Sequence, residues 1–199
     1  MADPRQRPPD RRVVRSRRAI LRAALDELAD AGYAGFAMDA VAQRAGVGRS
    51  TLYRHWNDRA VLVADALEEL NVQPGAPPEA PDPRVRVELL LGHLCEALTE
   101  SPVGRCLPAL VHAAEREDAL RDFLHSYSAR RRRALTEAVA AAVAAGAVRR
   151  VDPDEASAAL SGAVFYRRLM TSAPMSRADV PPLVEAVLGH RPTEDRKHH

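Results

Sequence analysis

A dense group of hydrogen-bond donors lies between residues 49 and 59 of the chain. Two apolar residues, Leu52 and Trp56, interrupt the group. Guanidinium groups form paired hydrogen bonds with guanine O6 and N7, and hydroxyl and imidazole groups suit phosphate oxygens. A helix that packs by its apolar residues and presents such donors on its other face is typical of DNA-reading elements. The donors are Arg49, Ser50, Thr51, Tyr53, Arg54, His55 and Arg59.

Short helices are predicted to position these donors. The run Gly46-Val47-Gly48 predicts a tight turn between two of them. An earlier helix repeats apolar residues every three or four positions, and Gly32 is placed to end it. A later helix begins after Asn57 or Asp58, either of which can cap it. The four predicted helices cover residues 16–31, 38–45, 49–55 and 58–70.

Positive charge is concentrated in the same part of the chain. Residues 1–60 hold 12 Arg against 7 Asp and Glu, a local charge of +5. Residues 61–199 hold 17 Lys and Arg against 20 acidic residues, a local charge of −3. Residues 1–16 are predicted to form a basic, disordered arm. Its arginines either contact DNA phosphates or the minor groove, or they only keep the chain soluble, and the sequence leaves both readings open.

A proline-rich linker divides the chain. Residues 71–83 contain five prolines and a glycine, which excludes a continuous helix. An N-terminal domain over residues 17–70 therefore precedes a helical domain over residues 84–190, and residues 191–199 form a tail. We predict an all-α fold of about nine helices, five of them after the linker. For the last helix we take Asp179 as the capping residue rather than Ser176, because two prolines then fall in its first turn.

Composition excludes several classes of protein. The longest mostly apolar run, residues 138–148, is too short to span a membrane, and no signal peptide is visible. We therefore expect a cytoplasmic protein with no membrane partner. Cys95 and Cys106 lie in apolar helical patterns, so we expect buried thiols, with a redox-sensing pair as the alternative.

No catalytic or metal-binding pattern is present. The histidines His93, His112 and His125 lack the spacing of a ligand set, so neither a metal nor a cofactor is predicted. We see no nucleophile elbow or phosphate-binding loop, so we expect a non-enzyme. The alternative is an enzyme fused to a DNA-binding head, and a pocket holding a perturbed acid–base pair would favour it.

Residues 38–62, MDAVAQRAGVGRSTLYRHWNDRAVL, resemble the DNA-binding segment of TetR-family transcriptional regulators. The matching groups are Val41-Ala42, Ala45-Gly46-Val47, Thr51-Leu52-Tyr53 and His55-Trp56, and Arg59 stands where the family has Lys. Two departures, Ala37 for Thr and Gly48 for Ser, each remove a side-chain cap and weaken a helix start by about 1 kcal/mol or less. More weakly, residues 148–171 resemble one C-terminal subgroup of the family.

The resemblance implies roles for the donors listed above. Arg49, Ser50, Tyr53 and Arg54 fall at positions that contact base edges. Thr51, His55 and Arg59 fall at positions that contact phosphates, and Tyr53 is shared between the two sets. We expect the partner to be double-stranded operator DNA.

The resemblance also implies a homodimer in which the last two helices of each chain form a four-helix bundle. The apolar stripe of the final helix supports this independently, because a terminal helix has nothing else to cover it. Packing of that stripe within one chain is the alternative. The predicted interface residues are Leu160, Val164, Val180, Leu183, Val184, Val187 and Leu188.

A ligand pocket is implied between the first three helices of the second domain. Any of its residues could instead be plain core. The predicted lining is Leu94, Leu98, Leu107, Leu110, Val111, Phe123, Leu124, Tyr127, Phe165 and Leu169. The resulting hypothesis is a homodimeric repressor that binds a pseudo-palindromic operator and is released by a small, hydrophobic effector. The alternative is a DNA-binding regulator without a small ligand, controlled by a protein partner or by its own concentration.

Overall fold

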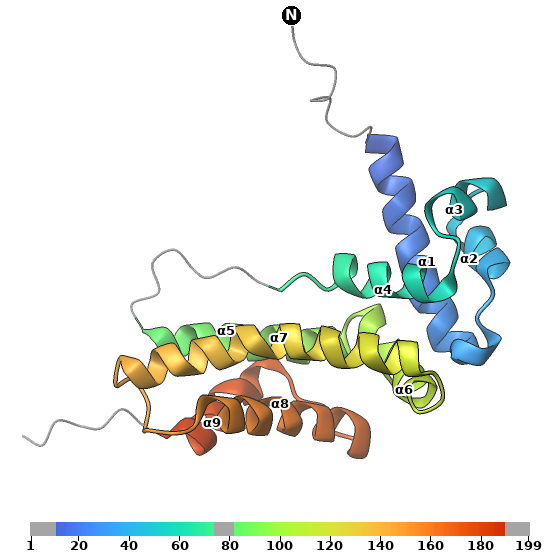
Figure 1. Ribbon diagram of the computed structural model, residues 1–199. Coiled ribbons are helices and arrows are strands. Elements are labelled where there is room, and N and C mark those ends of the chain that lie inside the picture. Colours follow the sequence, from blue (N-terminus) through green and yellow to red (C-terminus); the bar gives the residue numbers. More distant parts are fainter. Residues whose placement is uncertain (1–10, 74–81, 190–199) are drawn as a thin grey trace, which may run out of the picture. The chain divides into compact units, whose positions relative to one another are not determined.

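The computed structural model describes residues 11–73 and 82–189, and every regular element within them is helical (Figure 1). These ranges hold nine α-helices and one short 3-10 helix, η2. The all-α prediction is confirmed, and the predicted order of helices is the observed one. The bounds are α1 Arg11–Gly35, α2 Met38–Ala45, α3 Arg49–His55, α4 Arg59–Leu70, α5 Pro83–Thr99, α6 Pro102–Ala114, α7 Asp118–Ala144, α8 Pro153–Met170, η2 Arg177–Asp179 and α9 Val180–Leu188.

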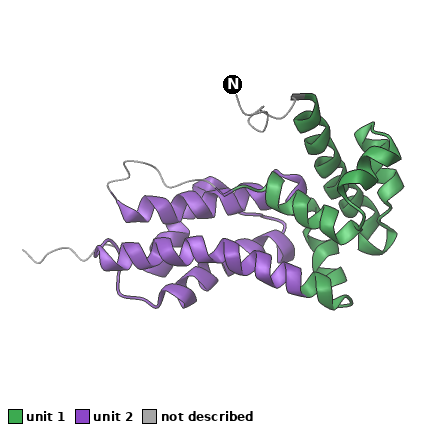
Figure 2. Cartoon of the chain, turned by 45° about the horizontal axis from the view of Figure 1, so that its top comes forward, with its two compact units in different colours: residues 1–72, 105–121 green, residues 73–104, 122–199 purple. Residues whose placement is uncertain are grey.

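The chain divides into two compact units (Figure 2). Unit 1 comprises residues 1–72 and 105–121, and unit 2 comprises residues 73–104 and 122–199. The sequence analysis placed residues 105–121 in the second domain, whereas the structure groups them with α1 to α4. The reason is a set of side-chain contacts that the sequence does not reveal: Arg105 pairs with Asp26 of α1, and Glu117 pairs with Arg59 of α4.

Unit 1 is built around α1, which packs against α2 and α4. The apolar face that the three- and four-residue spacing predicted is buried, and so is the single tryptophan of the chain. Trp56 is 1% exposed, and its Nε1 donates a hydrogen bond of 2.9 Å to Asp65. Arg17 lies over the same ring, 4.8 Å from its centroid. The core residues are Ile20, Leu21, Leu25, Leu28, Val41, Leu52, Leu62 and Leu67.

The first helix differs from its predicted bounds at both ends. It begins at Arg11 rather than at residue 16, so the second part of the predicted arm is helical. Arginine is a good helix former, and these turns need no apolar face because they are exposed. The chain turns sharply at Gly32, where φ is 67°, and one further short helical segment follows. Residues 1–10 of the predicted arm lie outside the described residues.

Unit 2 has its core where α5, α8 and α9 pack together. This packing corrects the predicted dimer interface. Five of its seven residues are already buried within a single chain, with exposures of 0 to 2%, which leaves them almost no surface to offer a second subunit. Only Leu183 and Val187 remain half-buried. The five buried residues are Leu160, Val164, Val180, Val184 and Leu188.

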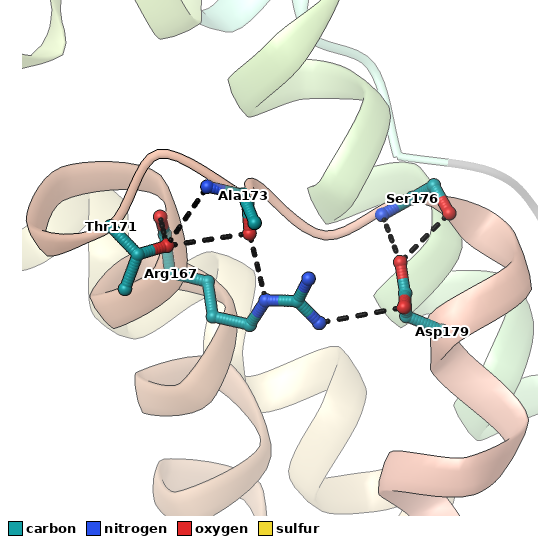
Figure 3. Close-up of polar contacts among 5 residues, drawn as sticks. All are labelled: Arg167, Thr171, Ala173, Ser176 and Asp179. Carbon is teal, nitrogen blue, oxygen red and sulfur yellow. Dashed lines mark hydrogen bonds and ion pairs between the residues drawn. The ribbon is translucent and has the colours of Figure 1, made fainter.

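The connection from α8 to α9 is held by polar contacts (Figure 3). The Asp179 carboxylate accepts hydrogen bonds of 2.8 Å from both the backbone N–H and the hydroxyl of Ser176, and these bonds lower the pKa of Asp179. Arg167 donates to the Ala173 carbonyl at 2.8 Å and pairs with Asp179 at 3.4 Å. The sequence analysis chose Asp179 over Ser176 as the cap. The helix α9 does begin after Asp179 with its prolines in the first turn, but the Asp179 side chain caps no N–H of α9 and bonds to Ser176 across η2 instead.

Both cysteines are buried free thiols, as predicted. Burial raises the pKa of Cys95 to about 11 and the pKa of Cys106 to about 12. Such thiols are almost entirely protonated at neutral pH and react poorly. Within the described part of the chain, no helix is both long and apolar enough to cross a membrane.

Candidate nucleic-acid interface

The turn between α2 and α3 has the geometry that its glycines predicted. Gly46 is left-handed, with φ 65°, and its N–H bonds back to the carbonyls of Ala42 and Gln43. Neither α2 nor α3 has a side-chain cap, because Ala37 and Gly48 occupy the capping positions. The seven-residue α3 is too short to be stable alone. Packing against the rest of the unit stabilises α3. Leu52 is fully buried, and Trp56, the residue after the end of α3, is buried and donates a hydrogen bond to Asp65.

The face of α3 opposite Leu52 is exposed and carries the predicted base-contacting set. Arg49, Ser50, Tyr53 and Arg54 are all exposed, and so is His55. A tyrosine that is 47% exposed on a seven-residue helix has no role in the core. The structure therefore brings these donors together on one surface, with Thr51 half-buried at its edge. This arrangement can offer hydrogen bonds to a groove of duplex DNA.

Arg49 already has an acidic neighbour. Its guanidinium lies 3.1 Å from the carboxylate of Asp39 in the first turn of α2, and its side chain is 73% exposed. A surface ion pair of this kind is weak and is screened by salt. Arg49 can therefore exchange Asp39 for a base edge or a phosphate at low cost.

Arg59 is placed differently from the other predicted contacts. At the start of α4, it donates to the backbone carbonyl of Tyr33 at 3.0 Å and to Glu117 at 3.2 Å. Its guanidinium also lies 4.2 Å from the centre of the Tyr33 ring. Burial, followed by the charge of Glu117, raises the pKa of Tyr33. The sequence analysis missed this cluster because Tyr33 and Glu117 are far from Arg59 along the chain.

A second set of ion pairs links α1 to α4 and to α2. Arg17 pairs with Asp65 at 3.0 Å and with Glu69 at 2.8 Å, both on α4. Arg44, in the last turn of α2, pairs with Asp30 at 2.7 Å and with Glu27 at 3.1 Å, both on α1. The spacing of four between Asp65 and Glu69 signals one shared helix face, but their partner cannot be read from the sequence.

The predicted pocket residues are distributed over both units. Leu107, Leu110 and Val111 belong to unit 1, and the other seven belong to unit 2. Val111 and Leu169 are more than 40% exposed, so neither lines an enclosed cavity within its unit. Leu98, Leu110 and Tyr127 are buried. The rings of Phe123 and Tyr127 stack with their centroids 5.8 Å apart.

Two of the three candidate histidines are engaged by arginines. His93 Nε2 lies 3.2 Å from Arg131, and His112 Nδ1 lies 3.0 Å from Arg116. Burial, followed by the charge of Arg131, lowers the pKa of His93. Across residues 11–73 and 82–189, no three His, Cys, Asp or Glu side chains are grouped so that they could hold a metal ion.

The three helices α1 to α3, with a tight α2–α3 turn and a donor-rich exposed face on α3, define a helix-turn-helix DNA-binding protein. Residues 20–66 match the bacterial regulatory proteins of the tetR family, and residues 77–187 match the tetracyclin repressor-like C-terminal domain. The chain therefore belongs to the TetR family of transcriptional regulators. Members of this family are DNA-binding regulators and not enzymes.

Three known proteins illustrate the similarity. The chain is 27% identical over 159 residues to YdeS of Bacillus subtilis (strain 168), described as an uncharacterized HTH-type transcriptional regulator, covering 77% of this chain and 78% of YdeS. A putative TetR-family regulator from Rhodococcus sp. superposes with a TM-score of 0.68 at 25% identity, covering 86% and 98% of the two chains. AibR, solved with isovaleryl coenzyme A and operator DNA, has a TM-score of 0.64 at 21% identity, covering 88% and 99%.

Proposed function

We propose that this regulator is a homodimeric repressor that binds a pseudo-palindromic operator through α3 and leaves it when a small ligand binds. The observation that carries the proposal is the exposed donor face of α3, whose other face is buried in unit 1. In a symmetric dimer, two such helices about 34–36 Å apart would enter successive major grooves. Arg49, Ser50, Tyr53 and Arg54 would read bases, and Thr51 and His55 would hold phosphates.

Selection from a random DNA library tests the operator. The expected result is an enriched inverted repeat whose half-sites are protected from cleavage one helical turn apart. A reporter placed behind that sequence should lose expression when the protein is present. Enrichment of no sequence would contradict operator recognition, and increased reporter expression would contradict the repressor role.

The dimer interface that the sequence predicted needs revision. Because most of that set is buried in the chain's own core, we propose the outer face of α8 and α9 instead. Tyr166 and Met170 on this face are 62% and 74% exposed. Next to them, Ala163, Pro182 and Leu183 help to line a hollow of about 400 Å³. A second copy covering these side chains would remove a large apolar surface from water.

A charge placed in this face tests the dimer. Leu183→Arg should give a monomer in light scattering and should lose operator affinity. Val85→Arg is the control, because Val85 is an exposed apolar residue of unit 2 that lies on α5. A Leu183→Arg variant that keeps the dimer mass would contradict this assignment.

The effector proposal is supported by family membership and by the ligand-bound state of AibR. Isovaleryl coenzyme A is therefore the first probe. Other acyl-CoA thioesters follow, and then apolar compounds of about the size of the isovaleryl group. The expected result is release of the selected DNA together with a rise in melting temperature of the free protein. If the DNA stays bound in every case, control by a protein partner or by concentration becomes the favoured reading.

A further inference from the structure

Two groups of arginines in unit 1 contrast with each other. Arg17, Arg44, Arg59 and Arg105 each pair with a carboxylate on another helix or connection of the unit. Arg15, Arg18 and Arg22 are exposed, and within the described residues none of them forms an ion pair or a side-chain hydrogen bond. The first group links different helices and connections of the unit. The second group, the α1 arginine row (Arg15, Arg18 and Arg22), has no structural task.

The α1 arginine row lies on one face of α1. Its spacing of three and then four residues stacks the side chains along the helix, over about 10 Å from first to last. Like charges at this spacing repel one another, so the row is unfavourable unless an anion lies against it. No carboxylate of the described residues pairs with the row, so its charge is available to an external anion.

The row borders a hollow of about 390 Å³ between α1 and the end of α2. Ala19, Ala23 and Ala45 contribute small side chains to its lining, so a ligand can approach the helices closely. Two other charged residues line it, Asp26 and Arg44, and both are already paired, with Arg105 and with Asp30 and Glu27 respectively. The unneutralised charge of the hollow is therefore positive and comes from the α1 arginine row.

The location of the row favours DNA as the source of the anion. In Figure 1 the N-terminal half of α1 and the helix α3 lie at the same end of unit 1, opposite the bend at Gly32. We propose that Arg15, Arg18 and Arg22 form a second phosphate-binding surface that holds the DNA backbone next to the bases read by α3. This inference rests on the proposed operator binding. Along the duplex axis one strand carries a phosphate about every 3.4 Å, so a 10 Å row spans about three phosphates.

The test removes the three charges together and compares salt dependence. The variant Arg15→Gln/Arg18→Gln/Arg22→Gln is measured against Arg132→Gln/Arg133→Gln/Arg150→Gln, which removes three equally exposed arginines from unit 2 and leaves the same net charge. Each lost phosphate contact should lower the slope of log affinity against log salt by about 0.9. The slope of the first variant should therefore be lower by up to about 2.7 per chain. Its hydroxyl-radical footprint should be shorter, and its selected sequence should be unchanged. The control should keep the slope and the footprint of the parent protein.

Three results would overturn the inference. A first variant with the same slope and footprint as the control would show that the row binds something other than DNA, such as an acidic protein. A changed selected sequence would show that the row reads bases rather than phosphates. A parent protein that binds no selected sequence would refute the proposed function itself, which is a separate outcome. If the triple variant unfolds, Arg22→Gln alone should still lose about 0.9 of slope.

Discussion

Arg49 and Arg59 carry the same charge but meet different neighbours. Arg49 projects from α3, and its one ion pair among the described residues is with the half-exposed carboxylate of Asp39. Arg59 is held by a carbonyl, a carboxylate and an aromatic ring. Substituting the first should therefore affect DNA reading alone, whereas substituting the second should also affect the stability of unit 1.

Arg49→Ala should relax base preference at one position of each half-site while leaving the free energy of unfolding unchanged. Loss of one bidentate contact with guanine corresponds to about 1–3 kcal/mol of discrimination. Library selection with the variant measures this directly. Asp39→Asn is the control: it removes the partner of Arg49 but keeps the guanidinium, so the preference should remain. An unchanged preference in Arg49→Ala would show that Arg49 does not read a base.

Glu117→Gln should strengthen DNA binding across all sequences, because it releases the Arg59 guanidinium from its carboxylate partner. A guanidinium gained as a phosphate contact steepens the salt dependence by about 0.9. Binding isotherms at several salt concentrations measure the slope. Glu115→Gln is matched in charge and lies on the same connection but at an exposed position, so its slope should stay at the parent value. If both variants behave alike, Arg59 is a structural residue only.

At the scale of elements, the junction of α5 and α6 depends on one glycine. The backbone of Gly104 runs so close to the end of α5 that a Cβ atom there would overlap the carbonyl of Leu98. Arg168 of α8 fixes the same junction by donating to the carbonyls of Leu98 at 2.8 Å and of Gly104 at 3.0 Å. These two bonds tie the junction to α8, so a larger residue at position 104 would require the backbone to shift.

Gly104→Ala should lower the free energy of unfolding by about 3 kcal/mol, the upper range for overpacking, because the overlap is with backbone and not with a mobile side chain. Chemical denaturation measures the loss. Gly162→Ala is the control on α8, where a Cβ would meet nothing within 4 Å and helix propensity favours alanine by up to about 1 kcal/mol. Equal stability of Gly104→Ala and the parent would contradict the described approach of the two helices.

At the scale of the whole molecule, acid should destabilise the fold through His93. Burial and the facing Arg131 lower the pKa of His93 below its ordinary value of 6.5, and Nε2 accepts a hydrogen bond only when it is neutral. The unfolded chain then binds this proton at a higher pH than the folded chain does. Stability is unaffected by His93 above about pH 6.5 and falls as the pH drops from there through the folded pKa.

Melting temperatures between pH 7.5 and pH 5 measure this fall. His93→Gln should flatten the curve, because the amide oxygen still accepts from Arg131 but cannot be protonated. His125→Gln, at an exposed position of α7, should leave the curve as in the parent. A curve that keeps its shape in His93→Gln would assign the pH dependence to other groups.

Local patterns by themselves determined the helices and the DNA-reading face. The spacing of apolar residues, the glycines at 32 and 46 and the helix-starting prolines each act within a few residues, so they are visible along the chain. The exposed side of α3 followed from its short length, which leaves room for only Leu52 as a buried anchor. Only the tertiary structure decided which partner each face and each arginine would meet. It buried Val184 and Leu188 within the single chain, joined Arg59 to Glu117, and gave Arg18 and Arg22 no carboxylate partner among the described residues. Those outcomes depend on contacts between residues far apart in sequence, which no local spacing encodes.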